Sequence, residues 1–368
     1  MKLCIAVTAR ASFARIVSVL RACQASPMLD LTVALHTSAM LPQYGDIRPV
    51  LTEMGINFRC LYNALIPGPT SAMAKTSGLA MVELATLFEE LKPDAVMTIA
   101  DRYETLATAA TAAYMNIPLI HLQGGERSGS IDDRVRDAVS MFAELHFPAT
   151  AKAAENLVRM DVRGKVWPVG CPSIDVIAAL DDKPVKWGQY TGIGPPVDPG
   201  CPYILVAQHP VTTEAHKAYA QMRETICAVT RAIREMQVQA IWIHPNLDAG
   251  TDGASKALRE LHEYAPALPI HFYRNIAPED FGRAMKHCMV LVGNSSAGIR
   301  ESAYLGTPVV NVGTRQRHRE RAENVVDADH NELEIYRRIR EQSEAVRYPR
   351  SRLYGDGHAA DRILEALW

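Results

Sequence analysis

Acidic side chains follow two apolar segments in the first half of the chain. Asp101 and Arg102 come one residue after Ala95–Ile99, and Glu126 and Asp132 come shortly after the next apolar segment. A carboxylate near the amino end of a helix stays ionised and suits a general base, whereas a carboxyl group in a partly closed cleft keeps its proton and suits a general acid. These residues therefore predict acid and base chemistry, although Asp101 is equally able to cap the helix that follows it.

The loop from Gln123 to Asp133 is expected to hold much of this chemistry. Its two adjacent glycines allow backbone shapes and a close approach of ligand that side chains block. Ser130, with Asp133 three residues later, fits the start of a capped helix, which leaves Asp132 for chemistry. The structural alternative is a loop whose polar residues only solvate a turn.

Two imidazoles follow apolar segments in the second half of the chain. His209 comes two residues after Tyr203–Ala207, where an imidazole is able to contact a phosphate or relay a proton. His244 and Asn246 occupy the equivalent place after Ala240–Ile243. That second segment is equally typical of a turn rich in Asn, Asp and Gly.

A loop of small residues, Gly293–Gly298, carries the hydroxyls of Ser295 and Ser296 between an expected strand and an expected helix. Such a turn presents hydroxyls and backbone N–H groups to an anion, and its geometry favours a diphosphate. Glu301, about one turn into the helix, fits hydrogen bonds to a ribose diol, although a helical Glu is often only solvated. The basic run Gly313–Arg321 indicates a solvated helix face or a local phosphate patch rather than a nucleic-acid site.

Short apolar, β-branched runs alternate with longer amphipathic stretches, which is typical of parallel βαβ units. The runs expected to form strands are Lys2–Thr8, Leu31–Leu35, Ala95–Ile99, Pro118–Leu122, Tyr203–Ala207, Ala240–Ile243, Met289–Val292 and Val309–Asn311. Lys183–Pro202 is too rich in Pro and Gly for a helix or a central strand, so the connection between two domains is expected there or just before it. Doubly wound domains bind ligands at the carboxyl ends of their strands, which predicts a site in a cleft between the two domains.

Composition excludes several classes of protein. The chain has 368 residues, of which 48% are hydrophobic, and a net charge of -2, which fits two globular domains without general affinity for nucleic acid. The turn Thr8–Ser12 has no glycine, so neither a dehydrogenase nor a Walker-type phosphate loop is expected. The seven cysteines of the chain show no C-x-x-C pair or zinc spacing, which predicts reduced thiols and no metal or redox cofactor. No signal peptide or apolar segment of ~20 residues is present, so a cytoplasmic protein without a membrane partner is expected.

Taken together, the segments resemble the UDP-N-acetylglucosamine 2-epimerase family, and most closely its hydrolysing branch. The motifs that carry the resemblance are Asp101-Arg102, His121-x-Gln-Gly-Gly-Glu126, Gly129–Asp133, Gln208-His209-Pro210, Asp248–Gly250, Gly293–Ser296, Gly313–Gln316 and Glu323–Val325. The resemblance implies an α/β fold of the GT-B type, with two Rossmann-like, doubly wound parallel-sheet domains. It places residues 1–175 in the first domain, with 352–368 returning to it through a helix at Ala359–Leu367, and residues 176–351 in a second domain that binds UDP.

The resemblance also implies a reaction that needs no cofactor. The family's hydrolysing members eliminate UDP across C1 and C2 of UDP-N-acetylglucosamine to give a 2-acetamidoglucal, then add water to release N-acetylmannosamine for sialic-acid-type and cell-surface sugars. Asp101, Glu126 and Asp132 take the acid, base and water-handling roles, and His209 lies near the phosphates or C1. The implied substrate contacts are Arg10, Ser295 and Ser296 on the diphosphate, Glu301 on the ribose, and Arg102, Gln123, His244, Asn246, Gly298 and Arg315. The implied partners are a UDP-sugar and further copies of the chain, as a dimer or tetramer.

One departure separates this chain from the non-hydrolysing relatives. Those relatives have His-Val-Glu-Ala-Gly-Leu-Arg, with an acid where this chain has Gln123, which cannot titrate. The base assignment therefore shifts to Glu126 or Asp132, and their order stays open. The alternatives are a hydrolysing epimerase of UDP-2,4-diacetamido-2,4,6-trideoxyhexose as in the legionaminic acid route, a non-hydrolysing epimerase, a glycosyltransferase on the same scaffold, and a catalytically silent UDP-sugar sensor.

Overall fold

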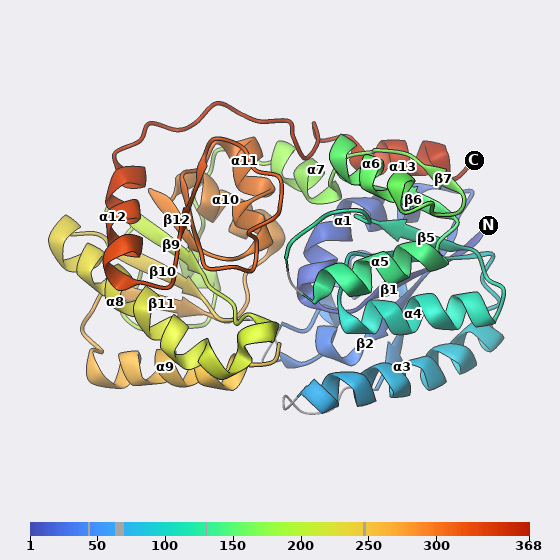
Figure 1. Cartoon of the computed structure of the whole chain (residues 1–368), viewed down its shortest axis with the longest axis horizontal. Helices are drawn as coiled ribbons and strands as arrows, with labels where there is room; N and C mark the ends of the chain where they lie inside the picture. The colour runs from blue at the N-terminus through green and yellow to red at the C-terminus, as the bar shows by residue number, and fades with distance from the viewer. Residues whose placement is uncertain (43–44, 63–69, 130, 246–247) are drawn as a thin grey trace. The chain divides into compact units, whose positions relative to one another are not determined.

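The structure is a computed structural model, and it describes residues 1–42, 45–62, 70–129, 131–245 and 248–368. The chain forms two compact units (Figure 1). Unit 1 comprises Met1–Arg127, Ile131–Ala178 and Tyr354–Trp368, and unit 2 comprises Ser128–Ser130 and Ala179–Leu353. Each unit is built around its own seven-stranded sheet.

The sheet of unit 1 is parallel throughout, in the order β3-β2-β1-β4-β5-β6-β7. Its strands are β1 (Lys2–Val7), β2 (Asp30–His36), β3 (Asn57–Leu61), β4 (Ala95–Ile99), β5 (Leu119–Leu122), β6 (Leu145–Phe147) and β7 (Lys165–Val166). The strand order reverses between β1 and β4, which is the topological switch point of a Rossmann sheet. Ile99 of β4 pairs with Leu122 of β5, so the loops that follow these two strands leave the sheet side by side.

Helices cover both faces of this sheet because successive strand residues point to opposite sides. The helices are α1 (Arg10–Ala25), α2 (Arg48–Glu53), α3 (Thr70–Leu91), α4 (Tyr103–Tyr114), α5 (Asp132–Phe142), α6 (Ala151–Arg159), α7 (Pro172–Ala178) and α13 (Ala359–Ala366). On one face, Leu3, Ile5 and Val7 of β1 lie in a core with residues of α1, α7 and α13. On the other, Cys4 lies in a core with residues of α3, α4 and α5.

The sheet of unit 2 has the order β14-β13-β12-β9-β10-β11-β8 and repeats the Rossmann arrangement. Its strands are β8 (Gly192–Ile193), β9 (Tyr203–Ala207), β10 (Gln239–Ile243), β11 (Ile270–Tyr273), β12 (Val290–Gly293), β13 (Val309–Val312) and β14 (Val325–Ala328). All pairs are parallel except that β8 runs antiparallel to β11 at the edge. The switch point lies between β9 and β12, where Ala207 pairs with Gly293.

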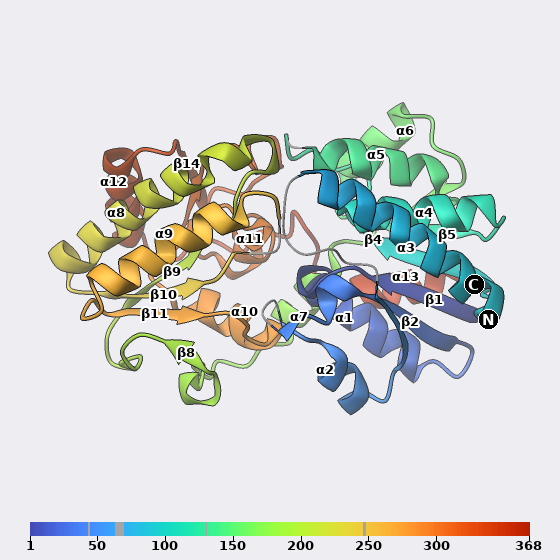
Figure 2. The same cartoon turned by 90° about the horizontal axis from the view of Figure 1, so that it is seen from below.

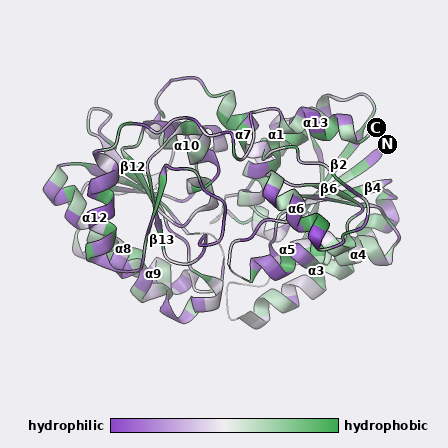
Figure 3. Ribbon diagram, turned by 45° about the horizontal axis from the view of Figure 1, so that its top comes forward, coloured by the Kyte–Doolittle hydropathy of each residue, from purple (hydrophilic) through white to green (hydrophobic). Residues whose placement is uncertain are grey.

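The helices of unit 2 are α8 (Ala218–Met236), α9 (Thr251–Tyr264), α10 (Pro278–His287), α11 (Glu301–Leu305) and α12 (Glu332–Ser343), with short 3-10 turns η3 (Trp187–Gln189), η4 (Thr212–Lys217) and η5 (Ser296–Gly298). One face of the sheet, with Trp242 at its centre, packs against α8, α9 and α12. Figure 2 shows α8 and α9 side by side over this sheet. Figure 3 shows apolar strands inside and polar stripes on the helices, as burial of the sheet on both faces requires.

All of the strands expected from apolar runs are present, with bounds that differ by no more than one residue at either end. The prediction of two Rossmann-like α/β domains is therefore confirmed. Lys183–Pro202 holds only the turn η3 and the two-residue edge strand β8, in agreement with its Pro and Gly content. Among the described residues, no helix combines the length and the apolar character that crossing a membrane requires.

Candidate functional site

Asp101 follows β4 through a backbone turn that another part of the sheet holds in place. Ala100 has a φ of 66°, a left-handed conformation that is uncommon for a residue with a side chain. Its N–H donates to the carbonyl of Leu122 (2.9 Å), and its carbonyl accepts from Nε2 of His121 (2.9 Å). The end of β5 therefore fixes the position from which the Asp101 side chain leaves the sheet, and a strained residue in such a place is a feature of functional sites.

His121 is neutral in this arrangement. Burial lowers its pKa from 6.5 to about 3. Since a carbonyl only accepts, Nε2 carries the proton, and Nδ1 accepts from the hydroxyl of Ser140 (3.0 Å). His121 thus supports the backbone beside Asp101 rather than titrating.

Arg136 forms ion pairs with two aspartates of unit 1, and no sequence argument identified it. Its guanidinium is fully buried on α5 and donates to the Asp101 carboxylate, to Oδ1 of Asp133 (2.6 Å) and to the carbonyl of Glu126 (2.5 Å). Burial opposes the charge, but Asp101 and Asp133 outweigh it and raise the Arg136 pKa. A buried guanidinium with carboxylate partners stays charged and fixes their positions.

The expected cap of α4 is not the one observed. α4 has Arg102 at its N-cap position without a side-chain cap hydrogen bond, so Asp101 does not serve as the N-cap of α4. α5 begins at Asp132 after Ile131, again without a side-chain cap, and Asp133 pairs with Arg136. Ser130, the expected cap partner, lies outside the described residues. The predicted cap between Ser130 and Asp133 therefore stays a prediction.

Arg102 is held by a buried acid. Its Nε donates to Oε2 of Glu104 (3.1 Å), and Glu104, fully buried, also accepts from the hydroxyl of Ser38 (2.9 Å). Arg102 therefore lies beside Asp101 with its guanidinium already oriented. From the sequence, Arg102 was expected only to support the cleft.

Gln123 and the glycines after it are packed against the protein. Gln123 has a φ of 61°, its Oε1 accepts from Arg15 (3.3 Å), and its Nε2 donates to the thiol of Cys171 (2.9 Å). A Cβ on Gly124 would lie 2.7 Å from Oγ of Ser140, so the glycine makes room for the His121–Ser140 hydrogen bond. The two glycines were expected to admit a ligand, but the described contacts show close approach by protein groups of α5 and α6. Glu126 follows them and is only 5% exposed.

In unit 2, His209 lies at the carboxyl end of β9, next to the loop that follows β12. Asn294, fully buried, accepts from the N–H of His209 at Oδ1 (2.8 Å) and donates through Nδ2 to the carbonyl of His209 (2.9 Å). Gly293 is required here because it has a φ of 134° and a Cβ would lie 2.3 Å from the carbonyl oxygen of Ala207. The sequence motif contained Asn294 but gave no reason to assign it a role.

The serine loop after β12 has the form expected of it. Ser295 is the N-cap residue of η5, where its Oγ accepts from the N–H of Ala297 (3.4 Å), and Ser296 begins the turn. Gly298 is buried, and a Cβ there would lie 3.0 Å from Leu291. Glu301 is the first residue of the five-residue helix α11, not one turn into a longer helix as expected. It is 9% exposed, and its Oε2 is buried without a hydrogen-bond partner among the described residues.

The basic segment Gly313–Arg321 forms no helix, so the expectation of a solvated helix face is wrong. Arg315 donates to the carbonyl of Asn294 (3.1 Å), and Nε of Arg319 donates to Oε1 of Gln316 (2.5 Å). The guanidinium of Arg321 pairs with Asp327 and donates to the carbonyl of Gln316 (2.7 Å). Arg315 and Arg321 thus donate to backbone carbonyls, and Arg319 donates to a side-chain amide.

The remaining expected contacts lie at strand ends or helix starts. Arg10 begins α1 after β1, and burial lowers its pKa to about 10, so the guanidinium stays charged at neutral pH. His244 follows β10, and burial, with Arg274 nearby, lowers its pKa to about 4. Asn246 lies outside the described residues. Asp248 accepts at its carbonyl from the hydroxyl of Thr251 (2.7 Å), as expected of a turn into α9.

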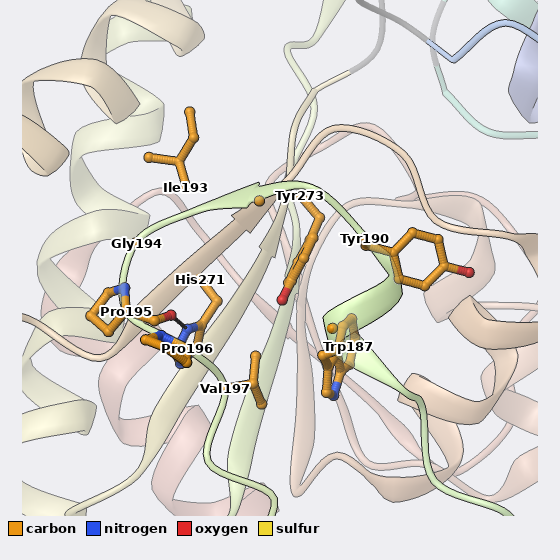
Figure 4. A pocket seen from close by; sticks show the side chains of 11 residues that line it. Trp187, Tyr190, Ile193, Gly194, Pro195, Pro196, Val197, His271 and Tyr273 are labelled. Atoms are coloured by element: carbon orange, nitrogen blue, oxygen red, sulfur yellow. Dashed lines mark hydrogen bonds between the residues drawn. The ribbon is translucent and has the colours of Figure 1, made fainter.

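A separate cavity of about 320 Å³ lies where the segment from Trp187 to Val197 folds over the edge of the unit 2 sheet (Figure 4). Trp187 stacks on Tyr273 with their ring centroids 5.1 Å apart. Nδ1 of His271 donates to the carbonyl of Pro195, and Nε2 of His271 is hydrogen-bonded to the side-chain amide of Gln239 (2.9 Å). The lining of this cavity includes none of the residues expected to bind substrate. Among the described residues, no three His, Cys, Asp or Glu side chains come together so as to hold a metal ion.

The two sheets define the class of the molecule, an α/β protein with two Rossmann-like domains of the GT-B type. Residues 21–368 match the family model described as UDP-N-acetylglucosamine 2-epimerase. The chain belongs to the UDP-N-acetylglucosamine 2-epimerase family, as the sequence resemblance predicted.

Curated relatives cover nearly the whole chain. The chain is 31% identical over 362 residues to the UDP-N,N'-diacetylbacillosamine 2-epimerase (hydrolyzing) of Legionella pneumophila, covering 97% of this chain and 93% of that protein. It is also 31% identical over 374 residues to the UDP-N-acetylglucosamine 2-epimerase of Neisseria meningitidis, covering 99% and 94%. Among solved structures, the UDP-GlcNAc 2-epimerase of Methanocaldococcus jannaschii in complex with UDP-GlcNAc and UDP has a TM-score of 0.78 at 16% identity, covering 100% of this chain and 99% of that one.

Proposed function

We propose that the protein is a hydrolysing 2-epimerase that converts UDP-N-acetylglucosamine and water into UDP and N-acetylmannosamine. The observation that carries the proposal is the buried cluster around Arg136, which holds Asp101 and Asp133 and the backbone of Glu126 at adjoining strand ends of unit 1. A UDP-sugar sensor or a glycosyltransferase has no need for so many acidic groups in one place. The proposal extends family membership, which is supported along residues 21–368, to a particular reaction.

The proposed reaction has two steps. A base removes the proton at C2 while the C1–O bond to UDP breaks, which leaves a 2-acetamidoglucal. Water then adds at C1 while an acid returns a proton to the opposite face of C2, giving free N-acetylmannosamine. The C2 proton is only weakly acidic, so the reaction needs a positioned base, a positioned acid and stabilisation of the departing diphosphate.

We assign the acid and base roles to Glu126 and Asp132, with Asp101 as the third acidic group. Glu126 is only 5% exposed and follows the end of β5, and Asp132 is the first residue of α5, so both lie on the segment that leaves this end of the unit 1 sheet. Gln123 takes no part in proton transfer, and its side chain lies against Arg15 and Cys171. Mutation of Glu126 and of Asp132 has to decide which of the two is the base and which is the acid.

We assign UDP to the serine loop, Glu301, Arg315, His209 and Arg10. The buried Oε2 of Glu301 has no donor among the described residues, which is costly unless a ligand supplies one, and a ribose hydroxyl is such a donor. Ser295 and Ser296 follow Asn294, whose carbonyl accepts from the guanidinium of Arg315. Charged donors of this kind are suited to a diphosphate.

NMR of the reaction in D2O tests the proposal. Incubation with UDP-N-acetylglucosamine is expected to give UDP and free N-acetylmannosamine that carries deuterium at C2. Formation of UDP-N-acetylmannosamine would make the protein a non-hydrolysing epimerase, and recovery of unchanged substrate would refute the assignment to this sugar.

The second candidate substrate is UDP-2,4-diacetamido-2,4,6-trideoxyhexose. It is favoured by the Legionella pneumophila relative, whose name specifies UDP-N,N'-diacetylbacillosamine and the hydrolysing reaction. A competition between the two nucleotide sugars in one tube decides between them from the ratio of the free sugars released.

We further propose that the protein is a cytoplasmic homo-oligomer that supplies sialic-acid-type or related cell-surface sugars. Size-exclusion chromatography with light scattering tests the oligomeric state. Analysis of the surface sugars in a deletion strain tests the role in their supply.

A further inference from the structure

Asn294 makes two hydrogen bonds to one residue on another strand end. Its side-chain amide accepts from the N–H of His209 (2.8 Å) and donates to the carbonyl of His209 (2.9 Å), so both polar groups of that backbone position are taken by one side chain. Asn294 is fully buried, with 0% of its surface exposed, and His209 is 7% exposed. A two-point contact of this kind restricts both the position and the rotation of the His209 backbone.

The backbone around Asn294 brings the amide into range. The N–H groups of Asn294 and Ser295 both donate to the carbonyl of Ala207 (3.1 and 3.2 Å). Gly293, whose conformation excludes a side chain, permits this close contact with β9. Backbone hydrogen bonds therefore hold the ends of β9 and β12 close together.

The carbonyl of Asn294 is a second point of attachment. It accepts from Nη1 of Arg315 (3.1 Å) and from Nε2 of Gln316 (3.1 Å), both in the loop after β13. Gln316 is 2% exposed and is itself held by Arg319. One residue thus connects the loops that follow β9, β12 and β13.

We propose that Asn294 is a positioning residue that sets the place of the His209 imidazole and, through its carbonyl, the place of the Arg315 guanidinium. The inference rests on the proposed function, in which both groups act on the diphosphate side of the substrate. Asn294 itself need not touch the substrate. It acts because a displaced imidazole loses its alignment with the reacting atoms, and a misplacement of about 1 Å is able to cost about 10²-fold in rate.

A double-mutant cycle with Asn294→Ala and His209→Asn tests the coupling. Asn294→Ala is expected to lower kcat about 10- to 100-fold, by the misplacement argument. In the His209→Asn background the same change is expected to lower kcat by less than about 2-fold, because the group that Asn294 positions is already gone. Losses that multiply in the double mutant would overturn the proposal.

Asn324→Ala is the matched control. Asn324 is 1% exposed, and its amide donates to Oγ of Ser302 (3.0 Å) and to the carbonyl of Thr307 (2.7 Å), so its loss removes a comparable buried amide that does not contact His209. It is expected to reduce thermal stability without the coupling to His209. Equal losses of kcat in Asn324→Ala and Asn294→Ala would show that Asn294 has only a structural role.

A readout without substrate separates this proposal from the proposed function. The imidazole Cε1–H NMR signal of His209, identified by its loss in His209→Asn, is expected to move in Asn294→Ala and to stay in place in Asn324→Ala. If the wild type releases no free sugar, the proposed function fails while this signal still decides the positioning role. If Asn294→Ala does not fold, Asn294→Asp keeps the acceptor for the His209 N–H and loses the donor to its carbonyl, and an unmoved signal in that variant overturns the proposal.

Discussion

Replacing Arg136 with Met removes the cation around which the carboxylates of unit 1 are arranged. Asp101 is 7% exposed, and the Arg136 guanidinium has no exposed surface, so the aspartate is left as a buried charge without its cation. Breaking a buried ion pair by removing one partner costs about 3–5 kcal/mol. The carbonyl of Glu126 loses its donor as well, which adds to the cost in the same direction.

Differential scanning calorimetry measures this loss. For a unit of this size a change of 1 kcal/mol moves Tm by about 2–4 °C, so Arg136→Met is expected to lower the Tm of unit 1 by about 6–20 °C. The matched control is Arg127→Met. Arg127 pairs with Asp137 at 2.6 Å, but the two side chains are 37% and 33% exposed, and such surface pairs contribute only about 0–1 kcal/mol.

A second change checks the cause. Asp101→Asn removes the charge that Arg136→Met leaves behind, so the double mutant is expected to be more stable than Arg136→Met alone. A Tm for Arg136→Met within about 2 °C of the Arg127→Met control would refute the reasoning, since that shift corresponds to less than about 1 kcal/mol. It would mean that solvent or another group compensates the Asp101 charge.

Glu126→Gln and Asp132→Asn are each expected to keep the fold, as judged by circular dichroism, and to lower turnover by about 10²–10⁴-fold, as loss of a general acid or base does; full activity in either variant excludes that residue. Ser296→Ala is expected to weaken UDP binding in isothermal titration calorimetry, and a fall in kcat at unchanged affinity contradicts its assignment. Burial lowers the pKa of His36 to about 4 and of His121 to about 3, whereas both are near 6.5 in the unfolded chain. Below pH 6.5 the unfolded state therefore takes up protons that the folded state does not, so stability falls by about 1.4 kcal/mol per histidine for each pH unit until the folded pKa is reached. Calorimetry at pH 7.5 and pH 5.5 is expected to show a lower Tm at pH 5.5, and an equal or higher Tm contradicts the buried neutral histidines.

The fold was predictable where strands are continuous apolar runs, as in Ala95–Ile99 and Tyr203–Ala207, which the structure reproduces residue for residue. Strands without such runs were missed. β3 alternates polar and apolar residues, with Asn57 and Arg59 on the polar side, and β8 has only two residues, so neither is a continuous apolar run. These strands exist because the neighbouring strand in the sheet supplies hydrogen-bond partners, which is information that a single segment lacks.

The acidic residues of the site were recognisable from their position after strands, but the groups that hold them were not. Arg136 lies three residues after Asp133 on the same helix, and that spacing was the available signal. Its contact with Asp101 spans 35 residues, and the contact of Asn294 with His209 spans 85 residues, so no spacing argument reaches either one.

Residues 354–368 lie in unit 1, although the whole of residues 179–353 separates them from the rest of it. Ala360 and Ile363 of α13 belong to the same apolar core as Ile16 and Leu20 of α1. All of residues 179–353 are therefore synthesised before α13 is able to cover this part of the unit 1 core. During synthesis unit 1 is started before unit 2 and completed after it, so its core keeps apolar surface exposed for longer.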